Sequence, residues 1–298
     1  MELAFIGLGK MGMNMVTRLR RDNHRVVTFD RSSELVTKSE AVGCHGASSL
    51  EDMVSKLQSP RVVWVMVPSG APTEESLQKL SKLLSPGDVL IDGGNSNFHD
   101  DQRRAEQFKA MGLNYVDVGT SGGIWGLQNG YCMMVGGEKS VVDTLKPVLD
   151  TLAPPNGWAY MGAAGAGHYV KMVHNAIEYS MMQGYAEGFE LMKKSGFNLD
   201  LARISDLWMQ GSVIRSWLLE LTAGFLKVNP NLDGLQGFVQ DSGEGRWTLV
   251  EAIDQAVPVP TLAAALFTRF RSRQVESFAE KMLAAMRNAF GGHAVNRR

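Results

Sequence analysis

Cysteine is scarce in this chain: Cys44 and Cys132 are the only two among 298 residues. Two cysteines cannot build the disulfide framework of a small secreted domain, and without further Cys or His residues at ligand spacing they predict no zinc site. We therefore expect no metal centre. The small number of cysteines also favours the reducing cytoplasm as the compartment.

Long apolar runs and a leader segment are missing as well. No run approaches the roughly 18 apolar residues that a membrane-spanning helix requires. Met1 leads directly into a short apolar strand, and not into a basic and then apolar leader. We therefore expect neither secretion nor insertion into a membrane.

The chain has no excess of charge of either sign. Its 30 Lys and Arg residues are balanced by 31 Asp and Glu residues, a net charge of −1, so no overall field attracts nucleic acid or an anionic membrane. Any basic site must be local, and the expected partner is a small molecule. At roughly 150 residues per domain, the length of 298 residues predicts two domains.

Short, nearly continuous apolar segments recur through the first half of the chain. Residues 62–67 read Val-Val-Trp-Val-Met-Val without polar alternation, which predicts a strand buried on both faces of a parallel sheet. Helix-like segments over 12–20 and 75–84 lie between strands, so the order is βαβ and the fold class is a doubly wound α/β domain of the Rossmann type. Strands are predicted at 3–6, 25–29, 62–67, 89–91, 115–118 and 131–135.

The first predicted turn has glycines at 7, 9 and 12, after a strand and before a helix. Gly7 permits a tight turn, Gly9 lets backbone N–H groups approach a pyrophosphate, and Gly12 lets the helix pack closely on the sheet. Asp30 ends the second strand 21 residues after Gly9, where its carboxylate can accept hydrogen bonds from the adenosine ribose. The pattern predicts a dinucleotide-binding domain over residues 1–163.

Asp30 and its neighbour Arg31 favour different cofactors. A carboxylate repels the 2′-phosphate of NADP, whereas a guanidinium one residue later can pair with that phosphate or stack on adenine. Because the repulsion acts at the hydroxyl that NADP modifies, we expect NAD to be preferred and leave some use of NADP open.

Two glycine-rich loops follow the carboxyl ends of predicted strands, the edge where open α/β sheets bind ligands. They are Asp92-Gly93-Gly94-Asn95-Ser96 and Gly119-Thr120-Ser121-Gly122-Gly123. The second is either a flexible turn or a nest of backbone N–H groups for a substrate carboxylate. The residues of this loop alone leave both interpretations open.

The second half of the chain changes to helical spacing after the small residues 162–167. We predict helices over about 167–194, 201–227, 246–255 and 261–290, with a loop over 229–245 that is rich in Gly, Asn and Asp. The second domain is therefore expected to be all-α and to cover residues 164–298.

The first of these helices carries a polar stripe in an otherwise apolar sequence. Lys171, His174, Asn175, Glu178 and Tyr179 share one helical face. A polar face usually points to solvent, but the rest of this helix is too apolar for a surface helix. A lysine and a glutamate two turns apart in a cleft suit acid–base catalysis, which we predict for Lys171 and Glu178.

The end of the chain is locally basic. Residues 269–298 hold seven Lys and Arg residues against Glu276 and Glu280. They form either a solvated basic face or a site where a few guanidinium groups bind phosphate.

Together these segments resemble the 6-phosphogluconate dehydrogenase family, the decarboxylating enzymes of the pentose phosphate pathway. The segments are 7–12 (GLGKMG), 92–96 (DGGNS), 121–123 (SGG), 171–179 (KMVHNAIEY) and 287–293 (RNAFGGH). The glycine turn and the Lys/Asn helix are common to all β-hydroxyacid dehydrogenases. The Asn95-Ser96 loop, the Glu178-Tyr179 pair and the 287–293 tail are typical of the phosphogluconate branch.

The resemblance implies a reaction. Lys171 would take the proton of the C3 hydroxyl while a hydride passes to the nicotinamide, and would then polarise the ketone as the β-keto acid loses CO2. Glu178 would protonate C1 of the enediol to give ribulose 5-phosphate. No metal is implied, because the β-ketone itself accepts the electrons released on decarboxylation.

The resemblance also implies the binding residues. The carboxylate would lie on residues 121–123, the sugar hydroxyls on Asn95, His174 and Asn175, and the 6-phosphate near Tyr179 and the basic residues. The substrate set is Asn95, Ser121, Gly122, Gly123, His174, Asn175, Tyr179, Arg269, Arg287 (from a neighbouring subunit) and His293. The cofactor set is Gly7, Leu8, Gly9, Met11, Gly12, Asp30, Arg31, Val67 and Asn95.

The chain departs from the long form of the family at two positions and in its length. Ser242 stands where the long form has a phosphate-binding lysine, and Arg246 is a candidate to compensate. Asp30 stands where the long form usually has asparagine. Because the chain also lacks most of the extended helical domain, it resembles the short form.

The short helical domain predicts assembly. An apolar face on a single tail helix, formed by Leu262, Leu266, Phe270, Phe278, Met282 and Ala285, would pack against a second subunit and supply burial that the short chain lacks. We expect an obligate homodimer or a dimer of dimers. Two other functions stay open: a dehydrogenase of an unphosphorylated acid such as 3-hydroxyisobutyrate, and a dinucleotide-binding regulator without catalysis.

Overall fold

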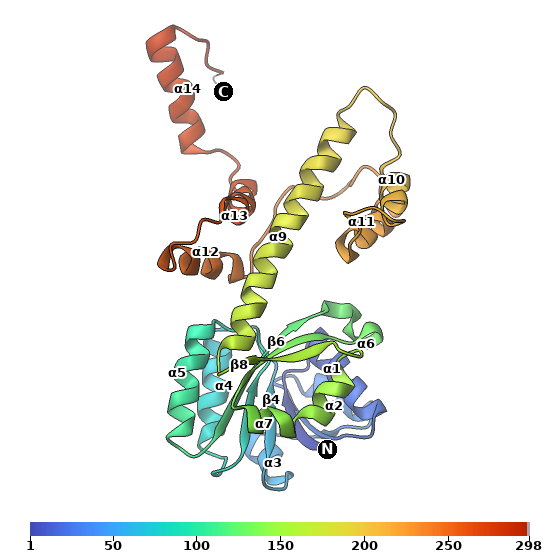
Figure 1. Ribbon diagram of the computed structural model, residues 1–298, viewed down its shortest axis with the longest axis vertical. Helices are drawn as coiled ribbons and strands as arrows, with labels where there is room; N and C mark the ends of the chain where they lie inside the picture. Colours follow the sequence, from blue (N-terminus) through green and yellow to red (C-terminus); the bar gives the residue numbers. More distant parts are fainter. Residues whose placement is uncertain (297–298) are drawn as a thin grey trace. The chain divides into compact units, whose positions relative to one another are not determined.

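The computed structural model describes residues 1–296 and has two compact units, Met1–His174 and Asn175–Arg298. The first unit is a sheet with helices on both faces and the second is helical (Figure 1). This confirms the predicted class, a Rossmann-type α/β domain followed by an all-α domain. None of the helices in the described residues is both long and apolar enough to cross a membrane.

The sheet of the first unit has the strand order β3-β2-β1-β4-β5-β6-β7-β8. Neighbouring strands are parallel except β6 and β7, which pair antiparallel. The strands are β1 (Glu2–Ile6), β2 (Arg25–Phe29), β3 (His45–Gly46), β4 (Val62–Val65), β5 (Val89–Asp92), β6 (Asn114–Ser121), β7 (Cys132–Gly137) and β8 (Trp158–Gly162).

Alternate residues of the central strands enter two separate apolar cores, one on each face of the sheet. Phe5 and Trp64 belong to one core, whereas Ala4 and Val63 belong to the other. Burial on both faces explains why these strands lack polar alternation. The helices of this unit are α1 (Lys10–Arg21), α2 (Ser33–Ala41), α3 (Leu50–Ser55), α4 (Ala71–Ser81), α5 (Phe98–Lys109), α6 (Gly126–Asn129), α7 (Lys139–Thr144) and α8 (Lys146–Leu152), with the 3-10 turn η1 (Gly123–Trp125).

The sequence prediction missed the two edge strands. β3 has only two residues, and β8 is largely exposed, so neither shows the buried apolar run by which the other strands were found. The predicted strand over 62–67 is also two residues too long, since β4 ends at Val65.

Two of the long helices predicted for the second unit are each two helices. The predicted helix 201–227 is α10 (Leu201–Trp208) and α11 (Trp217–Val228), and the predicted helix 261–290 is α13 (Pro260–Ser272) and α14 (Phe278–Gly291). Ser216 and Ser277 accept hydrogen bonds at the starts of α11 and α14, so each serine caps a new helix. The single apolar face predicted along 262–285 is therefore wrong.

The remaining helices of the chain are α9 (Ala166–Lys193) and α12 (Glu244–Asp254). The predicted domain limit at 163/164 falls just before α9, whereas the two compact units meet within this helix, at His174/Asn175. The limit at 163/164 stays a prediction.

Candidate active site

The glycine turn between β1 and α1 is shaped for close packing and for a ligand. Gly7 has φ of 92°, and a Cβ there would lie 2.3 Å from the Met66 carbonyl oxygen. A Cβ at Gly12 would lie 2.0 Å from the Gly7 carbonyl oxygen, but a Cβ at Gly9 would meet nothing within 4 Å. Two glycines are thus required by the fold, and the third leaves open space at the N-terminus of α1, which fits a dinucleotide pyrophosphate.

Asp30 holds this turn in place. One carboxylate oxygen accepts from the Leu8 N–H at 2.7 Å and the other accepts from the Ser32 N–H at 2.8 Å. A carboxylate oxygen can accept more than one hydrogen bond, so a ribose hydroxyl can be added. The neighbouring Arg31 lies 3.5 Å from the exposed Glu75 carboxylate.

Asn95 joins the two predicted ligand loops. Its side-chain oxygen accepts from the Thr120 N–H at 2.9 Å, and its amide nitrogen donates to the Thr120 carbonyl at 3.2 Å. Its φ of 53° lies in the left-handed region, which asparagine tolerates better than most residues. The 92–96 loop and the end of β6 therefore form one edge, and Thr120 is a residue that the sequence analysis did not assign.

Lys171, His174 and Ser121 form a contact row. The Lys171 Nζ lies 3.3 Å from His174 Nδ1, and the His174 Nε2 lies 3.4 Å from the Ser121 hydroxyl oxygen. Lys171 is buried, and a Cβ on Gly119 would lie 2.4 Å from the Lys171 Cβ, so this glycine makes room for the lysine. Two separately predicted motifs, the polar stripe of α9 and the 121–123 loop, are thus brought together.

The rest of the 121–123 loop is a turn with two consecutive glycines at positive φ. Gly122 has φ of 132° and Gly123 has φ of 52°. A Cβ on Gly123 would meet nothing within 4 Å. Consecutive N–H groups in such a turn can bind an anion.

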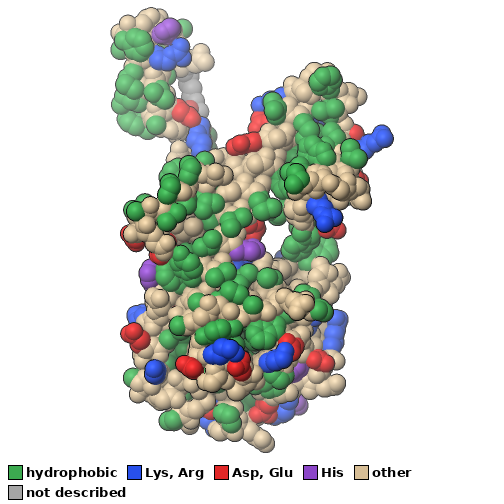
Figure 2. Space-filling model, viewed as in Figure 1, with side chains coloured by type: hydrophobic (Ala, Val, Ile, Leu, Met, Phe, Trp, Pro, Cys, Tyr) green, Lys and Arg blue, Asp and Glu red, His purple; other side chains and the backbone are tan. Residues whose placement is uncertain are grey.

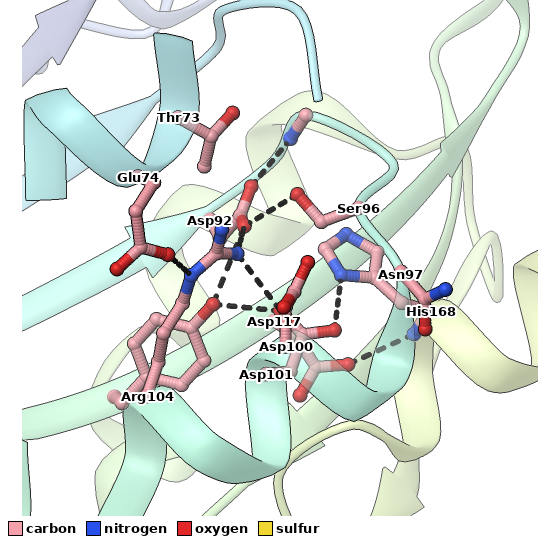
Figure 3. Close-up of polar contacts among 12 residues, drawn as sticks. Thr73, Glu74, Asp92, Ser96, Asn97, Asp100, Asp101, Arg104, Asp117 and His168 are labelled. Atoms are coloured by element: carbon pink, nitrogen blue, oxygen red, sulfur yellow. Dashed lines mark hydrogen bonds and ion pairs between the residues drawn. The ribbon is translucent and has the colours of Figure 1, made fainter. Parts of the chain in front are cut away.

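Beneath this edge lies a buried polar network, shown in Figure 3. Asp92 ends β5, and its carboxylate accepts from the Ser96 hydroxyl at 2.7 Å, from the Gly94 N–H at 2.9 Å and from the Arg104 guanidinium at 3.0 Å. Arg104 also donates to Glu74 at 2.8 Å. The carboxylate of Asp92 thus fixes the start of the Asn95 loop.

A second part of the network reaches α9. Asp101 accepts from the Tyr115 hydroxyl at 2.7 Å and lies 2.7 Å from His168 Nδ1. Burial alone would lower the pKa of the His168 imidazole, but the carboxylates of Asp101, Asp92 and Asp117 raise it to about 10, so it is a cation. Burial raises the pKa of the Asp117 carboxyl to about 6, although the His168 charge opposes the rise.

Asp92, Asp101 and His168 are residue types that can bind a metal ion. One carboxylate oxygen or ring nitrogen from each lies within 4.8 Å of the others. The Arg104 guanidinium and the His168 imidazolium already neutralise these carboxylates, so we interpret the cluster as an ion network. The sequence analysis named Asp92 and Ser96 as parts of a ligand loop but did not predict the network or its other members. Asp92 and Asp117, charged residues in buried strands, and His168, one turn before Lys171, were the available signals.

In the second unit, Arg269 and Ser242 contact Tyr179. The Arg269 guanidinium stacks 3.6 Å from the centre of the Tyr179 ring, and the Tyr179 hydroxyl accepts from the Ser242 N–H at 3.1 Å. The Ser242 hydroxyl donates to Glu244 at 2.5 Å. The predicted pair Tyr179 and Arg269 is thus brought together, and Ser242 lies beside it.

Arg246 is bound elsewhere. It donates to Asp241 at 2.6 and 3.1 Å and stacks 4.4 Å above the Phe270 ring. Arg273 donates to the same carboxylate at 2.8 Å. Hydrogen bonds from Arg246 and then Arg273 hold the pKa of Asp241 at about 2, although burial opposes this shift.

Asn175, Glu178 and Arg287 lie on the helices α9 and α14, and His293 follows the end of α14. Asn175 and Glu178 are half-buried on α9. Arg287 is exposed on α14, and the exposed His293 follows the left-handed Gly292 with its ring 6.3 Å from that of Phe290. The structure therefore places these two tail residues on a surface of the helical unit.

Comparison with known proteins gives matches to both units. Residues 2–174 match the family described as the NAD binding domain of 6-phosphogluconate dehydrogenase. Residues 167–277 match the family described as the 6-phosphogluconate dehydrogenase C-terminal domain.

Relatives match the whole chain. It is 42% identical over 300 residues to an NAD(+)-dependent, decarboxylating 6-phosphogluconate dehydrogenase of Haloferax volcanii, covering 100% of this chain and 99% of the relative. It is also 42% identical over 298 residues, covering 100% of both chains, to a Bacillus subtilis protein provisionally named a 6-phosphogluconate dehydrogenase. The Plasmodium falciparum 6-phosphogluconate dehydrogenase has a similar structure, with a TM-score of 0.84 and 27% identity over 100% of this chain and 66% of that longer chain.

Proposed function

The chain belongs to the 6-phosphogluconate dehydrogenase family, and we propose that it oxidises and decarboxylates 6-phosphogluconate to ribulose 5-phosphate and CO2. The contact row Lys171, His174 and Ser121 carries the proposal, because it sets a buried lysine beside a loop suited to an anion. The glycine turn and Asp30 supply the fit for NAD or NADP.

In the proposed reaction Lys171 acts first as a base. It removes the proton of the C3 hydroxyl and becomes protonated. The positive charge of its ammonium group then polarises the C3 ketone while the C1–C2 bond breaks and CO2 leaves. A dinucleotide held at the glycine turn and Asp30 would supply the acceptor for the hydride of C3. Glu178, two turns further along α9, then protonates the enediol at the carbon that lost CO2, which is C2 of the substrate and becomes C1 of ribulose 5-phosphate.

The loops at the carboxyl edge of the sheet are proposed to hold the substrate. The N–H groups and hydroxyl of residues 121–123 would bind its carboxylate, while Asn95, His174 and Asn175 would bind its hydroxyls. The link between Asn95 and Thr120 supports this assignment, because it keeps the two loops in register before substrate arrives.

The 6-phosphate is proposed to bind near Tyr179 and Arg269, with Arg287 and His293 supplied by a second copy of the chain. Ser242 stands where the long form of the family has a lysine, and its N–H and hydroxyl already donate to Tyr179 and Glu244. Arg246 does not replace that charge in this arrangement, since Asp241 and Phe270 hold it. The phosphate site is therefore weaker in charge than that of the long form.

The finer properties follow from the same residues. We propose that NAD is preferred because of Asp30, that the active assembly is a homodimer or a dimer of dimers, and that the enzyme works in the cytoplasm on gluconate-derived sugar acids. The exposed pair of Arg31 and Glu75 supports the preference for NAD, because Glu75 competes with a 2′-phosphate for the guanidinium.

An assay of substrate choice tests the proposal. We expect purified enzyme to reduce NAD with 6-phosphogluconate and to react far more slowly with gluconate or 3-hydroxyisobutyrate. Arg269→Met should raise the KM for 6-phosphogluconate by about tenfold or more, because a charge-assisted hydrogen bond is lost, and leave the KM for NAD unchanged. A preference for 3-hydroxyisobutyrate would establish the unphosphorylated acid as substrate, and no turnover with any acid would favour a regulator.

A further inference from the structure

One side of α9 connects the buried network to the reacting lysine. His168, Lys171 and His174 follow one another at intervals of three residues, so their side chains are neighbours along the helix. At one end His168 lies 2.7 Å from Asp101, and both side chains are fully buried. At the other end His174 contacts Lys171 and Ser121.

The start of α9 is fitted closely against the sheet. Asp117 on β6 accepts from the N–H groups of Gly165 at 2.7 Å and His168 at 2.8 Å. A Cβ on Gly167 would lie 2.4 Å from the Met134 carbonyl oxygen. These contacts fix where the helix begins, and the His168 side chain adds a contact to Asp101 on α5.

Stability alone is a poor explanation for a buried pair of this kind. Replacing a buried ion pair by apolar residues of similar volume often leaves stability unchanged or improves it. Asp101 is anchored from two elements, because it lies on α5 and accepts from Tyr115 on β6. Such a rigid anchor is suited to holding a neighbouring group at a set angle.

We propose that Asp101 and His168 are positioning residues for Lys171, fixing the first turns of α9 so that the lysine amino group meets the substrate at the carboxyl edge of the sheet. This inference rests on the proposed role of Lys171 as the base. Neither residue touches the reacting atoms; both act through the helix.

The test compares two buried carboxylates in the same unit. Asp88 is a matched control. It lies just before β5, at the amino ends of the strands, away from the carboxyl ends where Lys171 is proposed to act. Its side chain is 1% exposed and accepts hydrogen bonds from Arg61 and Ser85. We expect Asp101→Asn to lower kcat by about tenfold to a hundredfold, as misplaced catalytic groups do, with the KM for substrate and the Kd for NAD unchanged. Asp88→Asn should lower thermal stability but leave kcat unchanged at temperatures where it is folded.

Two further measurements separate positioning from general damage. The kinetic isotope effect with substrate deuterated at C3 should rise in Asp101→Asn and not in Asp88→Asn, because only the first slows the chemical step. Hydrogen exchange of the peptide covering 166–174 should likewise accelerate only in Asp101→Asn. His168→Asn, whose amide can still donate to Asp101, should keep more activity than His168→Ala.

The outcomes are distinct. Equal losses of kcat in both aspartate variants, or a wild-type isotope effect and exchange rate in Asp101→Asn, would overturn the inference. If the wild-type enzyme oxidises no acid, the proposed function fails, and the exchange experiment by itself decides whether Asp101 holds the first turns of α9.

Discussion

The two units bury their apolar residues to very different degrees. The sheet unit has two large cores, with residues such as Phe5, Trp64 and Leu77 completely buried. In the helical unit the buried cluster of Tyr179, Ala265 and Leu266 is small, and a few other residues such as Leu219 and Leu226 on α11 are buried as well. Large apolar side chains are exposed on its helices instead, among them Phe278 at 76% and Phe290 at 79% on α14, and Figure 2 shows such side chains gathered on this unit.

The difference shows which part of the chain is complete by itself. In the sheet unit the proposed base, its neighbours and the network that orients them are all internal. In the helical unit Arg287 lies on a helix flanked by uncovered apolar residues. Exposed apolar surface of this extent is typical of a protein interface, so a second copy is the proposed partner of α14.

The largest expected effect concerns the sheet unit. Lys171→Met should lower kcat by about 10²–10⁴-fold, the usual contribution of a general base, while binding of NAD measured by fluorescence is unchanged. Lys193→Met, at the exposed end of the same helix, is the control and should keep full activity. A Lys171→Met enzyme with more than about a tenth of wild-type turnover, far outside that range, contradicts the assignment. Glu178→Gln should impair product formation more than cofactor binding.

The next prediction tests whether the helical unit completes a neighbouring site. Lys171→Met and Arg287→Ala should each be inactive, but co-expression should give mixed dimers with one intact site, so activity returns toward half of the wild-type value per mixed dimer. Sedimentation should show a dimer. If no activity returns, Arg287 acts within its own chain. The helical unit then does not complete the site of a second copy.

A smaller effect is expected for cofactor choice, because the residues proposed to set it lie in the sheet unit. Asp30→Asn should shift the ratio of kcat/KM toward NADP by about tenfold, or 1–2 kcal/mol, because the repulsion of the 2′-phosphate is removed. The same change disturbs the bonds to Leu8 and Ser32, so the variant should also melt earlier. Glu34→Gln, a nearby exposed charge, should leave the ratio unchanged. Unaltered selectivity in Asp30→Asn would show that another residue sets the preference.

The last prediction is a dependence of stability on pH. The pKa of His168 is raised from 6.5 to about 10 in the folded state, so the stability it contributes is complete below pH 6.5 and is lost as the pH rises through 10. The free energy of unfolding should therefore fall over this range, and Asp101→Asn should flatten the fall. Asp241→Asn in the helical unit is the control and should keep the wild-type alkaline slope. Denaturation curves followed by circular dichroism measure both.

Much of the fold and part of the site could be predicted from local sequence. The central strands are buried on both faces, so each is a continuous apolar run that can be recognised in the sequence. The glycine turn before α1 is likewise a local motif. The break between α13 and α14 could not be found from apolar spacing, because both halves keep helical periodicity and only the cap at Ser277 marks the new start.

The pattern of the residues was enough to predict a dinucleotide-binding fold for the first unit and to place Lys171 in an apolar helix. What surrounds that lysine depends on how distant elements pack together. Asp101 and His168 are 67 residues apart in the chain, and nothing in either residue type shows that they will be buried together. A charge is tolerated in a protein interior only where folding supplies its partner, and that pairing is a property of packed elements and not of any local pattern.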